Sequence, residues 1–288
     1  MKDYPLKPYM GHIDESVRPS GQSRKWYPFD CPESYAEYLK RPNLDEIPDS
    51  YRLDDGWEYH FNKARFRGEE FDFDAKKRIA VCGCSNTFGL GIKWEQTFAY
   101  QFKRRYAEQH NLKEDEVNLL NFAECGASND YIARTLLMQF GGFRPDFVLI
   151  NFTFQTRKEY VDGDSIEVVG PWTHLDTPHE PSMDYFAYFT NEIGFINSVK
   201  NMLLIQYYCQ ANDIPYLFAW TDGRNLKDPE YMSNPVCKAY VDQLDKTYLA
   251  DFTLQFDSAA RENFHPGPKV NEDFAARLFD LYQQVHGN

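Results

Sequence analysis

Three residues of this chain have the side-chain types that nucleophilic catalysis requires. Ser85 lies two residues after Gly83, where a short apolar run ends, and His265 lies far away near the other end of the chain. A serine hydroxyl is a weak nucleophile and needs a base within hydrogen-bond reach, which an imidazole can supply. Glu262 precedes His265 by three residues, a spacing at which one turn of chain holds the carboxylate beside the ring and sets its orientation.

Taken alone, the same residues have a simpler explanation that involves no catalysis. A serine at the start of a helix commonly serves as an N-cap, and a lone histidine is commonly exposed. Whether Ser85 and His265 form a site depends on whether the fold brings them together. We interpret four other histidines as structural or exposed: His12, His60, His110 and His286.

The sequence predicts an α/β fold. From about residue 76 onward, short apolar runs alternate with segments of helical period, a pattern typical of a parallel sheet covered on both faces. The expected strands are Arg78–Cys82, Val117–Phe122, Asp146–Phe152, Pro215–Trp220 and, with a weaker pattern, Asp251–Phe256. The expected helices are Trp94–His110, Asn129–Phe140, Asp184–Ala211, Asn234–Leu249 and Asn271–Val285. We therefore expect a three-layer α/β/α sandwich around a parallel sheet of about five strands.

In such a sheet, chemistry belongs beyond the carboxyl ends of the strands. The loops that follow the first three expected strands and the fifth contain a serine, a glycine, a side-chain amide and an acid–histidine pair. Residues 1–57 differ in character, because seven of the sixteen prolines lie in the first 48 residues. We expect them to form a proline- and aromatic-rich arm with a short helix near Ser34–Leu39, appended to a domain of residues 58–288.

Five segments resemble, in order, sequence blocks of the SGNH (GDSL-type) hydrolase family. Tyr59–Gly68 is similar to the lead-in Y-x-x-N-x-x-G-F-R-G, and Arg78–Ile92 resembles R-I-x-x-x-G-D-S-x-T-x-G-x-G-V. Asn121–Gly126 resembles a second block that ends in glycine. Pro145–Thr156 looks like P-D-x-V-x-x-x-x-G-x-N-D, and Glu262–Pro266 looks like D-x-x-H-P. Five blocks in family order, framing residues 59–285, are a specific signal.

The resemblance implies a flavodoxin-like α/β/α fold and assigns roles to individual residues. It makes Ser85 the nucleophile, His265 the base and Glu262 the acid that orients His265. It builds an oxyanion hole from the backbone N–H groups of Ser85 and Gly126 and the side-chain amide of Gln155.

Four departures of this chain from the family pattern bear on the site or on the lead-in turn. Cys84 and Glu262 replace aspartates, Arg65 replaces a lead-in glycine, and Gln155 replaces the asparagine of the oxyanion hole. The loss of a donor of that kind typically lowers the rate by roughly 10²–10³.

An insertion at residues 157–181 follows the third expected strand. The D-G pair within Val161–Ile166 lies between β-prone residues and predicts a hairpin. Because it leaves the carboxyl edge of the sheet, we expect it to overhang the site and to supply Trp172, His174 or His179 to a substrate pocket. An ordinary surface hairpin is the equal alternative. The pocket residues that we expect are Asn86, Asn129, Trp172 and His174.

No cofactor or metal is expected. The glycines near Ser85 do not fit the phosphate-binding patterns G-x-x-x-x-G-K-[ST] or G-x-G-x-x-G. Cys82 and Cys84 have no second pair at metal-ligand spacing, so the six cysteines are interpreted as reduced thiols in and near the core. Two alternatives stay open, with Cys84 either as the nucleophile or as part of a redox-sensitive pair with Cys125.

Composition excludes several other classes of protein. The chain has 31 Lys and Arg against 44 Asp and Glu, a formal net charge of −13, so we expect no nucleic-acid partner. No apolar run approaches the roughly 18 residues of a membrane span, so we expect no membrane partner. The first residues, MKDYPLKPYMGHIDES, lack an apolar segment, so we expect no secretory signal and a cytoplasmic location. A homo-oligomer is left open.

The expected function is that of a serine esterase acting through an acyl-enzyme. The resemblance implies a small acyl ester of O-acetyl type, with a carbohydrate or a similar polar molecule as the alcohol. The alternative is a catalytically degraded SGNH-like domain that binds glycans or protein partners. Labelling of Ser85 by a fluorophosphonate separates the two hypotheses.

Overall fold

The centre of the protein is a four-stranded parallel sheet. The computed structural model describes residues 17–162, 165–175 and 180–287. The sheet has the order β4-β3-β5-β8. Its strands are β3 (Lys77–Gly83), β4 (Val117–Asn121), β5 (Phe147–Phe152) and β8 (Tyr216–Trp220). The chain leaves the sheet between strands through helices, as parallel pairing requires.

β3 lies inside the sheet, with a parallel neighbour on each side. Val81 is in register with Asn121 of β4, and Gly83 with Asn151 of β5. Every residue of β4, β5 and β8 is buried, which explains their near-continuous apolar runs. The end of β3 is therefore flanked by the loops that follow β4 and β5.

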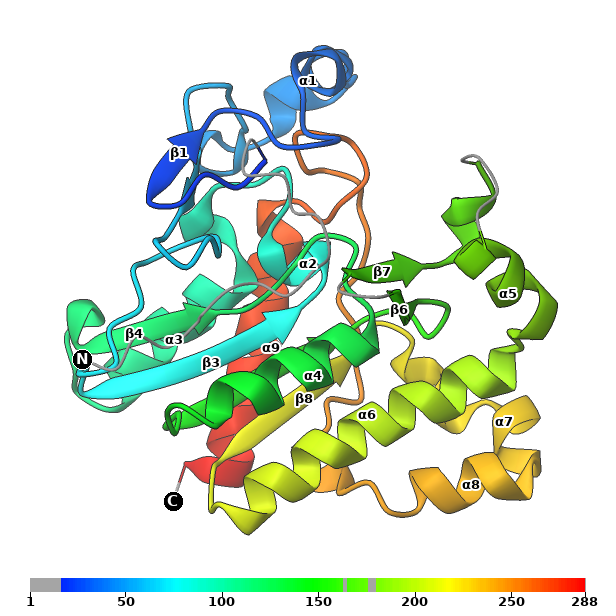
Figure 1. Cartoon of the computed structure of the whole chain (residues 1–288). Helices are drawn as coiled ribbons and strands as arrows, with labels where there is room; N and C mark the ends of the chain where they lie inside the picture. Colours follow the sequence, from blue (N-terminus) through cyan, green and yellow to red (C-terminus); the bar gives the residue numbers. More distant parts are fainter. Residues whose placement is uncertain (1–16, 163–164, 176–179, 288) are drawn as a thin grey trace.

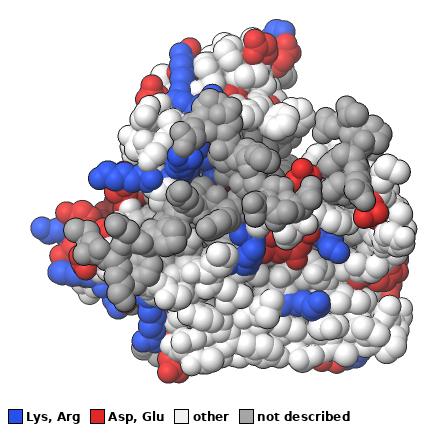
Figure 2. Space-filling model, viewed as in Figure 1, with Lys and Arg blue, Asp and Glu red and all other residues white. Residues whose placement is uncertain are grey.

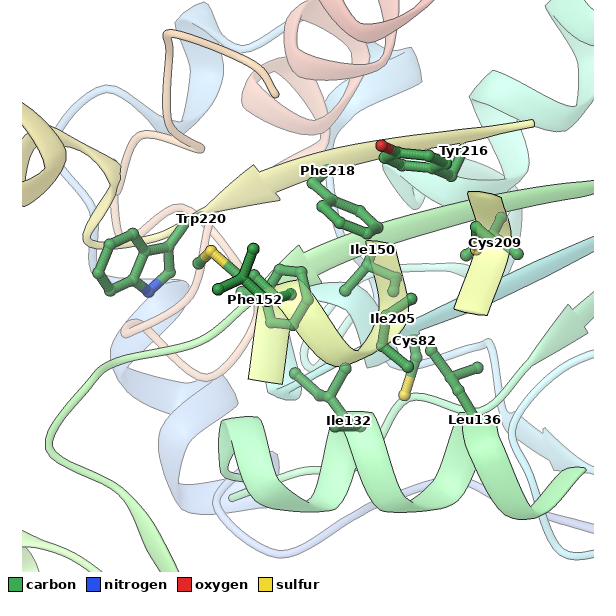
Figure 3. Close-up of a cluster of buried hydrophobic side chains, with 14 of the residues drawn as sticks. Cys82, Ile132, Leu136, Ile150, Phe152, Ile205, Cys209, Tyr216, Phe218 and Trp220 are labelled. Atoms are coloured by element: carbon green, nitrogen blue, oxygen red, sulfur yellow. The ribbon is translucent and has the colours of Figure 1, made fainter. Parts of the chain in front are cut away.

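Helices cover both faces of the sheet (Figure 1). Helices α3 (Phe98–Gln109) and α9 (Pro268–His286) pack on one face, and α4 (Asn129–Phe140) and α6 (Asn191–Ala211) on the other. Figure 3 shows the second of these cores, in which Ile132 and Leu136 of α4 and Ile205 of α6 approach Ile150 and Phe152 of the sheet. The predicted α/β/α sandwich is confirmed.

The prediction of a fifth strand at Asp251–Phe256 is wrong. The chain pairs with β8 at a single bridge between Phe218 and Leu249, where the Ala250 N–H donates to the Phe218 carbonyl at 2.8 Å. Beyond Ala250 it leaves the sheet edge and continues as irregular chain toward the loop that contains His265. The alternation of apolar residues there reflects contacts of single side chains, such as buried Leu254, rather than a ladder of backbone hydrogen bonds.

Two predicted helices are interrupted by polar caps. The expected helix Asp184–Ala211 is two helices, α5 (Glu180–Tyr188) and α6, because the Thr190 hydroxyl accepts from the Ile193 N–H at 3.2 Å and starts a new helix. The expected helix Asn234–Leu249 is α8 (Pro235–Val241), followed by a 3₁₀ turn at Lys246–Tyr248. Helix α4 has the predicted bounds, and its N-cap is Ser128.

The remaining elements are short and lie around this sandwich. They are β1 (Gln22–Arg24), α1 (Pro32–Tyr38), β2 (Tyr59–Phe61), α2 (Ser85–Phe88), β6 (Lys158–Asp162), β7 (Ser165–Val169), α7 (Pro229–Ser233) and 3₁₀ turns at Leu44–Glu46, Asp49–Tyr51, Trp94–Gln96, Glu114–Glu116, Pro171–Leu175 and Gly223–Lys227. In the part of the chain that the structure describes, none of the helices combines the length and the hydropathy needed to cross a membrane.

The N-terminal arm packs on the sandwich from residue 17 onward. Strand β1 pairs antiparallel with β2, and the Tyr27 ring lies 4.9 Å from the ring of Phe88, at the end of α2. The lead-in turn that follows β2 places Arg65 at φ +67°, which explains why glycine suits this position in the family pattern. Nothing here tests the predicted boundary at residue 57, which stays a prediction.

Candidate active site

Ser85 lies at the carboxyl end of β3, where the chain turns abruptly into α2 (Figure 1). Gly83 makes the turn possible, because a Cβ there would lie 2.0 Å from Thr87 Oγ1 and 2.9 Å from the Asn151 carbonyl oxygen. No side chain fits in that space. The sharp turn presents the serine hydroxyl at the edge of the sheet, where the sequence predicts it.

The structure brings Ser85, His265 and Glu262 into one hydrogen-bonded chain. Ser85 Oγ lies 2.8 Å from His265 Nε2, and His265 Nδ1 lies 2.9 Å from Glu262 Oε1. Ser85 retains 7% of its surface and the His265 side chain 19%, so the ring is open to solvent on one side. With Nδ1 protonated toward the carboxylate, Nε2 is the acceptor that faces the serine hydroxyl.

Glu262 is buried, with 1% of its surface exposed, and is oriented by its own loop. Its Oε1 also accepts the His265 N–H at 2.8 Å, and its Oε2 accepts the Phe264 N–H at 3.2 Å. Glutamate therefore reaches the imidazole although it is one methylene longer than aspartate. Three N–H groups satisfy a carboxylate that burial would otherwise destabilise.

The loop that carries Glu262 and His265 is anchored to the segment that follows Ser85 and α2. The Arg261 N–H donates to the Gly91 carbonyl at 2.8 Å. Gly91 has φ +76°, and a Cβ on it would lie 3.0 Å from Glu262 Cγ and 2.9 Å from the Ala260 Cβ. Glycine at this position lets the segment after α2 and the loop of Glu262 approach each other closely.

The N-terminal arm holds the same loop from its other side. The Arg261 side chain donates to Asp30 through Nε and Nη2, at 2.9 and 2.6 Å, in an ion pair whose two side chains are both 0% exposed. Arg41 donates to Asn263 Oδ1 at 3.0 Å, and Asn263 donates to the Ser34 carbonyl at 3.1 Å. Sequence reasoning missed these anchors, because no local pattern marks partners more than 200 residues apart.

Two backbone N–H groups, those of Ser85 and Gly126, belong to the segments at the ends of β3 and β4. The loop after β4 is tied to the end of β3 by the Glu124 N–H, which donates to the Gly83 carbonyl at 3.1 Å. Gly126 follows with φ +80°, and a Cβ on it would meet open space. Among the described residues, neither the Ser85 N–H nor the Gly126 N–H donates to another group. Both are therefore available to an oxyanion.

The structure corrects the role predicted for Gln155. Its side-chain nitrogen donates to the Tyr231 hydroxyl at 2.7 Å and to the Asn191 carbonyl at 3.4 Å, and its side-chain oxygen accepts from Asn225 at 3.0 Å. Both amide protons are thus used away from Ser85. Gln155 fixes the loop after β5 to α7, and in this arrangement the amide is not an oxyanion donor.

Of the predicted pocket residues, Asn129 is also corrected. Its amide exchanges hydrogen bonds with the backbone of Thr153, at 2.8 and 3.2 Å, and donates to Ser198 Oγ at 2.8 Å, so it is a buried tie between α4 and the loop after β5. Asn86, next to the nucleophile, is 3% exposed, and its amide has no partner among the described residues.

The predicted hairpin forms from β6 and β7, and the chain after it returns toward the site. Trp172, 37% exposed, lies over the guanidinium of Arg157. His174 belongs to the turn Pro171–Leu175, but its side chain lies outside the described part of the structure. His179 also lies outside the described residues.

Three cysteines lie near the site: Cys82, Cys84 and Cys125. Burial raises the pKa of the Cys125 thiol to about 12, against a smaller opposite effect of the Arg18 guanidinium. Burial likewise raises the pKa of Cys82 far above its usual range. Cys84, directly before Ser85, is fully buried and free of a disulfide. The hydroxyl of Ser85, and not the Cys84 thiol, is the group in contact with His265.

No protein-family model matches this chain, and no curated protein matches it. Solved structures resemble it. The esterase EstA from a Pseudoalteromonas species, inhibited by monoethylphosphonate, is 14% identical with a TM-score of 0.44, over 74% of this chain and 100% of that chain. A carbohydrate esterase is 13% identical with a TM-score of 0.45, over 74% of this chain and 67% of that chain.

A member of the lipolytic G-D-S-L family from Veillonella parvula is 10% identical with a TM-score of 0.39, over 73% of this chain and 100% of that chain. In each case the matched part is about three quarters of the present chain. The solved structures that resemble this chain at this low identity thus include esterases and a member of the lipolytic G-D-S-L family.

Proposed function

We propose that this protein is a serine esterase that hydrolyses small acyl esters through an acyl-enzyme. The observation that carries the proposal is the hydrogen-bonded chain from Ser85 through His265 to Glu262, with contacts of 2.8 and 2.9 Å. Serine, imidazole and buried carboxylate in this order are the arrangement that makes a hydroxyl nucleophilic at neutral pH.

The proposed reaction has two halves. His265 Nε2 takes the hydroxyl proton as Ser85 Oγ attacks the ester carbonyl, and the N–H groups of Ser85 and Gly126 donate to the oxyanion. Collapse of the tetrahedral intermediate expels the alcohol, which receives the proton from His265. Water then attacks the acyl-enzyme by the same route, with His265 again as base, and releases the carboxylic acid and the free serine. Glu262 stabilises the imidazolium in each half.

The substrate class that we propose is an ester of O-acetyl type on a carbohydrate or a similar polar alcohol. Hydrolysis of 4-nitrophenyl acetate tests the reaction without the natural alcohol. A fluorophosphonate tests the nucleophile directly, because it labels an activated serine and does not label a binding domain that has lost catalysis.

The decisive experiment compares the parent protein with Ser85→Ala and with Ser233→Ala, an exposed serine far along the chain. The parent and Ser233→Ala should be labelled at Ser85 and should hydrolyse the acetate. Ser85→Ala should do neither while keeping its fold, as measured by circular dichroism. If Ser85→Ala still hydrolyses the acetate, Ser85 is not the nucleophile. If the parent protein is neither labelled nor active, the result favours the alternative of a glycan- or protein-binding domain.

A further inference from the structure

Arg157 lies at the edge of the sheet that carries Ser85 and forms no ion pair with an acidic side chain among the described residues. Of its guanidinium nitrogens only Nη1 has a hydrogen-bond partner among the described residues, the Ala127 carbonyl at 3.1 Å. Its Nε is buried and unpartnered. An unsatisfied buried donor on a charged group is energetically costly.

A nearby cation of this acidic chain has an acidic partner. Arg134, on the neighbouring α4, forms a two-pronged ion pair with Glu159 at 3.0 and 2.7 Å. On the face shown in Figure 2, Lys and Arg lie interspersed with Asp and Glu. Asp222 is near enough for Arg157 to lower its pKa, against the larger rise caused by burial, but the two form no ion pair.

Aromatic rings hold the Arg157 guanidinium in place. It lies 5.0 Å from the centre of the Phe154 ring and 5.2 Å from that of Trp172, and the Phe154 ring packs at 6.2 Å from half-exposed Phe256. Stacked rings restrain a planar guanidinium while leaving its in-plane N–H donors available to a ligand. The hairpin insertion supplies Trp172, and the loop after β5 supplies Phe154 and Arg157.

The sheet order places this guanidinium beside the candidate active site. Arg157 follows β5, and Ala127, which it contacts, follows β4 directly after Gly126. Since β3 lies between β4 and β5, the contact joins the two loops that flank the end of β3, where Ser85 lies. An ester carbonyl at Ser85 and Gly126 would therefore bring the rest of the substrate close to Arg157.

We infer that Arg157 binds a carboxylate carried by the substrate, so that the preferred ester is an acidic one. The inference rests on the proposed function, since it names the substrate class of that site. Carboxylates match the fork of guanidinium N–H donors in geometry and in charge. In a chain of net charge −13, an arginine that forms no ion pair among the described residues gives an anion a local attraction that opposes the repulsion by the net charge.

Matched aryl acetates test this inference. The acetate esters of 3- and 4-hydroxybenzoate carry a carboxylate at two distances from the acetyl group, and their methyl esters are the neutral counterparts. The parent enzyme should hydrolyse at least one acid with a kcat/KM about 10- to 100-fold above that of its methyl ester, the factor expected for a charged hydrogen bond. The preference is the ratio of two kcat/KM values measured on the same sample, so the fraction of inactive protein in that sample does not change it.

Three variants assign the preference to Arg157. Arg157→Gln should abolish it, and Arg157→Lys should keep part of it, because the charge remains and the planar fork is lost. Lys158→Gln is the control: it removes an adjacent positive charge that lies over the Tyr160 ring, at 5.6 Å, and should leave the preference unchanged. A parent enzyme without preference, or a preference that survives in Arg157→Gln, overturns the inference while the esterase stands.

Equilibrium binding separates the inference from the catalytic proposal. The Ser85→Ala variant should bind the acidic acetate about 10- to 100-fold more tightly than the methyl ester in calorimetry, and Ser85→Ala combined with Arg157→Gln should not. If no ester is hydrolysed but this difference is found, the esterase proposal fails and the carboxylate site stands. Equal binding of the two esters by both variants refutes the site.

Discussion

Asp30 and Arg261 form a fully buried ion pair that joins the N-terminal arm to the loop of the candidate active site. Two contacts of 2.9 and 2.6 Å link the side chains, and the guanidinium also lies 4.2 Å from the Trp26 ring and 3.9 Å from the Trp57 ring. Arg261 directly precedes Glu262. The arm is thereby connected to the residue that orients His265, and its contribution can be measured.

Asp30→Ala should destabilise the protein strongly. The change leaves the Arg261 charge buried without its partner, which typically lowers the free energy of unfolding by about 3–5 kcal/mol. Urea denaturation followed by fluorescence measures it. Asp55→Ala is the control, because its pair with Lys25 is exposed and contributes less than about 1 kcal/mol. Equal urea midpoints for Asp30→Ala and the parent would show that the pair does not anchor the arm.

Gly91→Ala should impair catalysis rather than only stability. A methyl group there meets Glu262 Cγ at 3.0 Å, so the carboxylate must shift, and kcat for 4-nitrophenyl acetate should fall at least about tenfold. Gly21→Ala is matched in backbone conformation, with φ +64°, but its new methyl group meets only Lys63 Cγ at 3.7 Å. It should lose about 1 kcal/mol of stability and no activity. An unchanged kcat in Gly91→Ala contradicts the close approach.

Gln155→Ala should lower stability while kcat changes little. The deletion leaves buried partners such as the Asn225 amide unsatisfied, at an expected loss of about 1–3 kcal/mol. Tyr231→Phe removes one of the same hydrogen bonds and should show a smaller loss of the same kind. If Gln155→Ala instead lowers kcat by roughly 10²–10³ while Tyr231→Phe is normal, the amide does reach the oxyanion.

Cys125 should be unreactive in the folded protein. Cys125 is partly exposed, but desolvation raises its pKa to about 12, so little of the thiol is the reactive thiolate at pH 8. Mass spectrometry after iodoacetamide treatment should find Cys125 unmodified in buffer and modified in guanidinium chloride. Rapid native modification would show an exposed, ionised thiol and would revive the hypothesis of a redox pair with Cys84.

The main features of the fold could be predicted because they depend on local patterns. Helix α4 has the predicted bounds, since an N-cap serine and a glycine frame one amphipathic segment. Asp251–Phe256 also alternates, but whether such a segment joins a sheet depends on an edge strand that is distant in sequence. The break between helices α5 and α6 at Thr190 could not be predicted from the helical period of apolar residues. That period continues across the break, which depends on a single capping hydroxyl.

The candidate site also has a part that could be predicted from the sequence and a part that could not. Ser85, His265 and Glu262 were predictable because a parallel sheet gathers the carboxyl ends of its strands, and the motifs mark which loops matter. The orientation of Gln155 was not, because it depends on Tyr231, which lies 76 residues away. The position of Arg157 could not be predicted from the sequence. What distinguishes this arginine is its contact with Ala127 and the absence of an ion pair among the described residues, and both depend on the fold.

The ion pair between Asp30 and Arg261 also constrains the order in which a newly made chain can mature. The two residues are 231 positions apart, so the arm emerges from the ribosome long before its cation exists. His265 and helix α9 are made later still. Contacts of such long sequence separation form late and slowly. The candidate site therefore assembles only after the segment that contains Arg261, Glu262 and His265 has been made, and until then Asp30 of the arm has no partner in that segment.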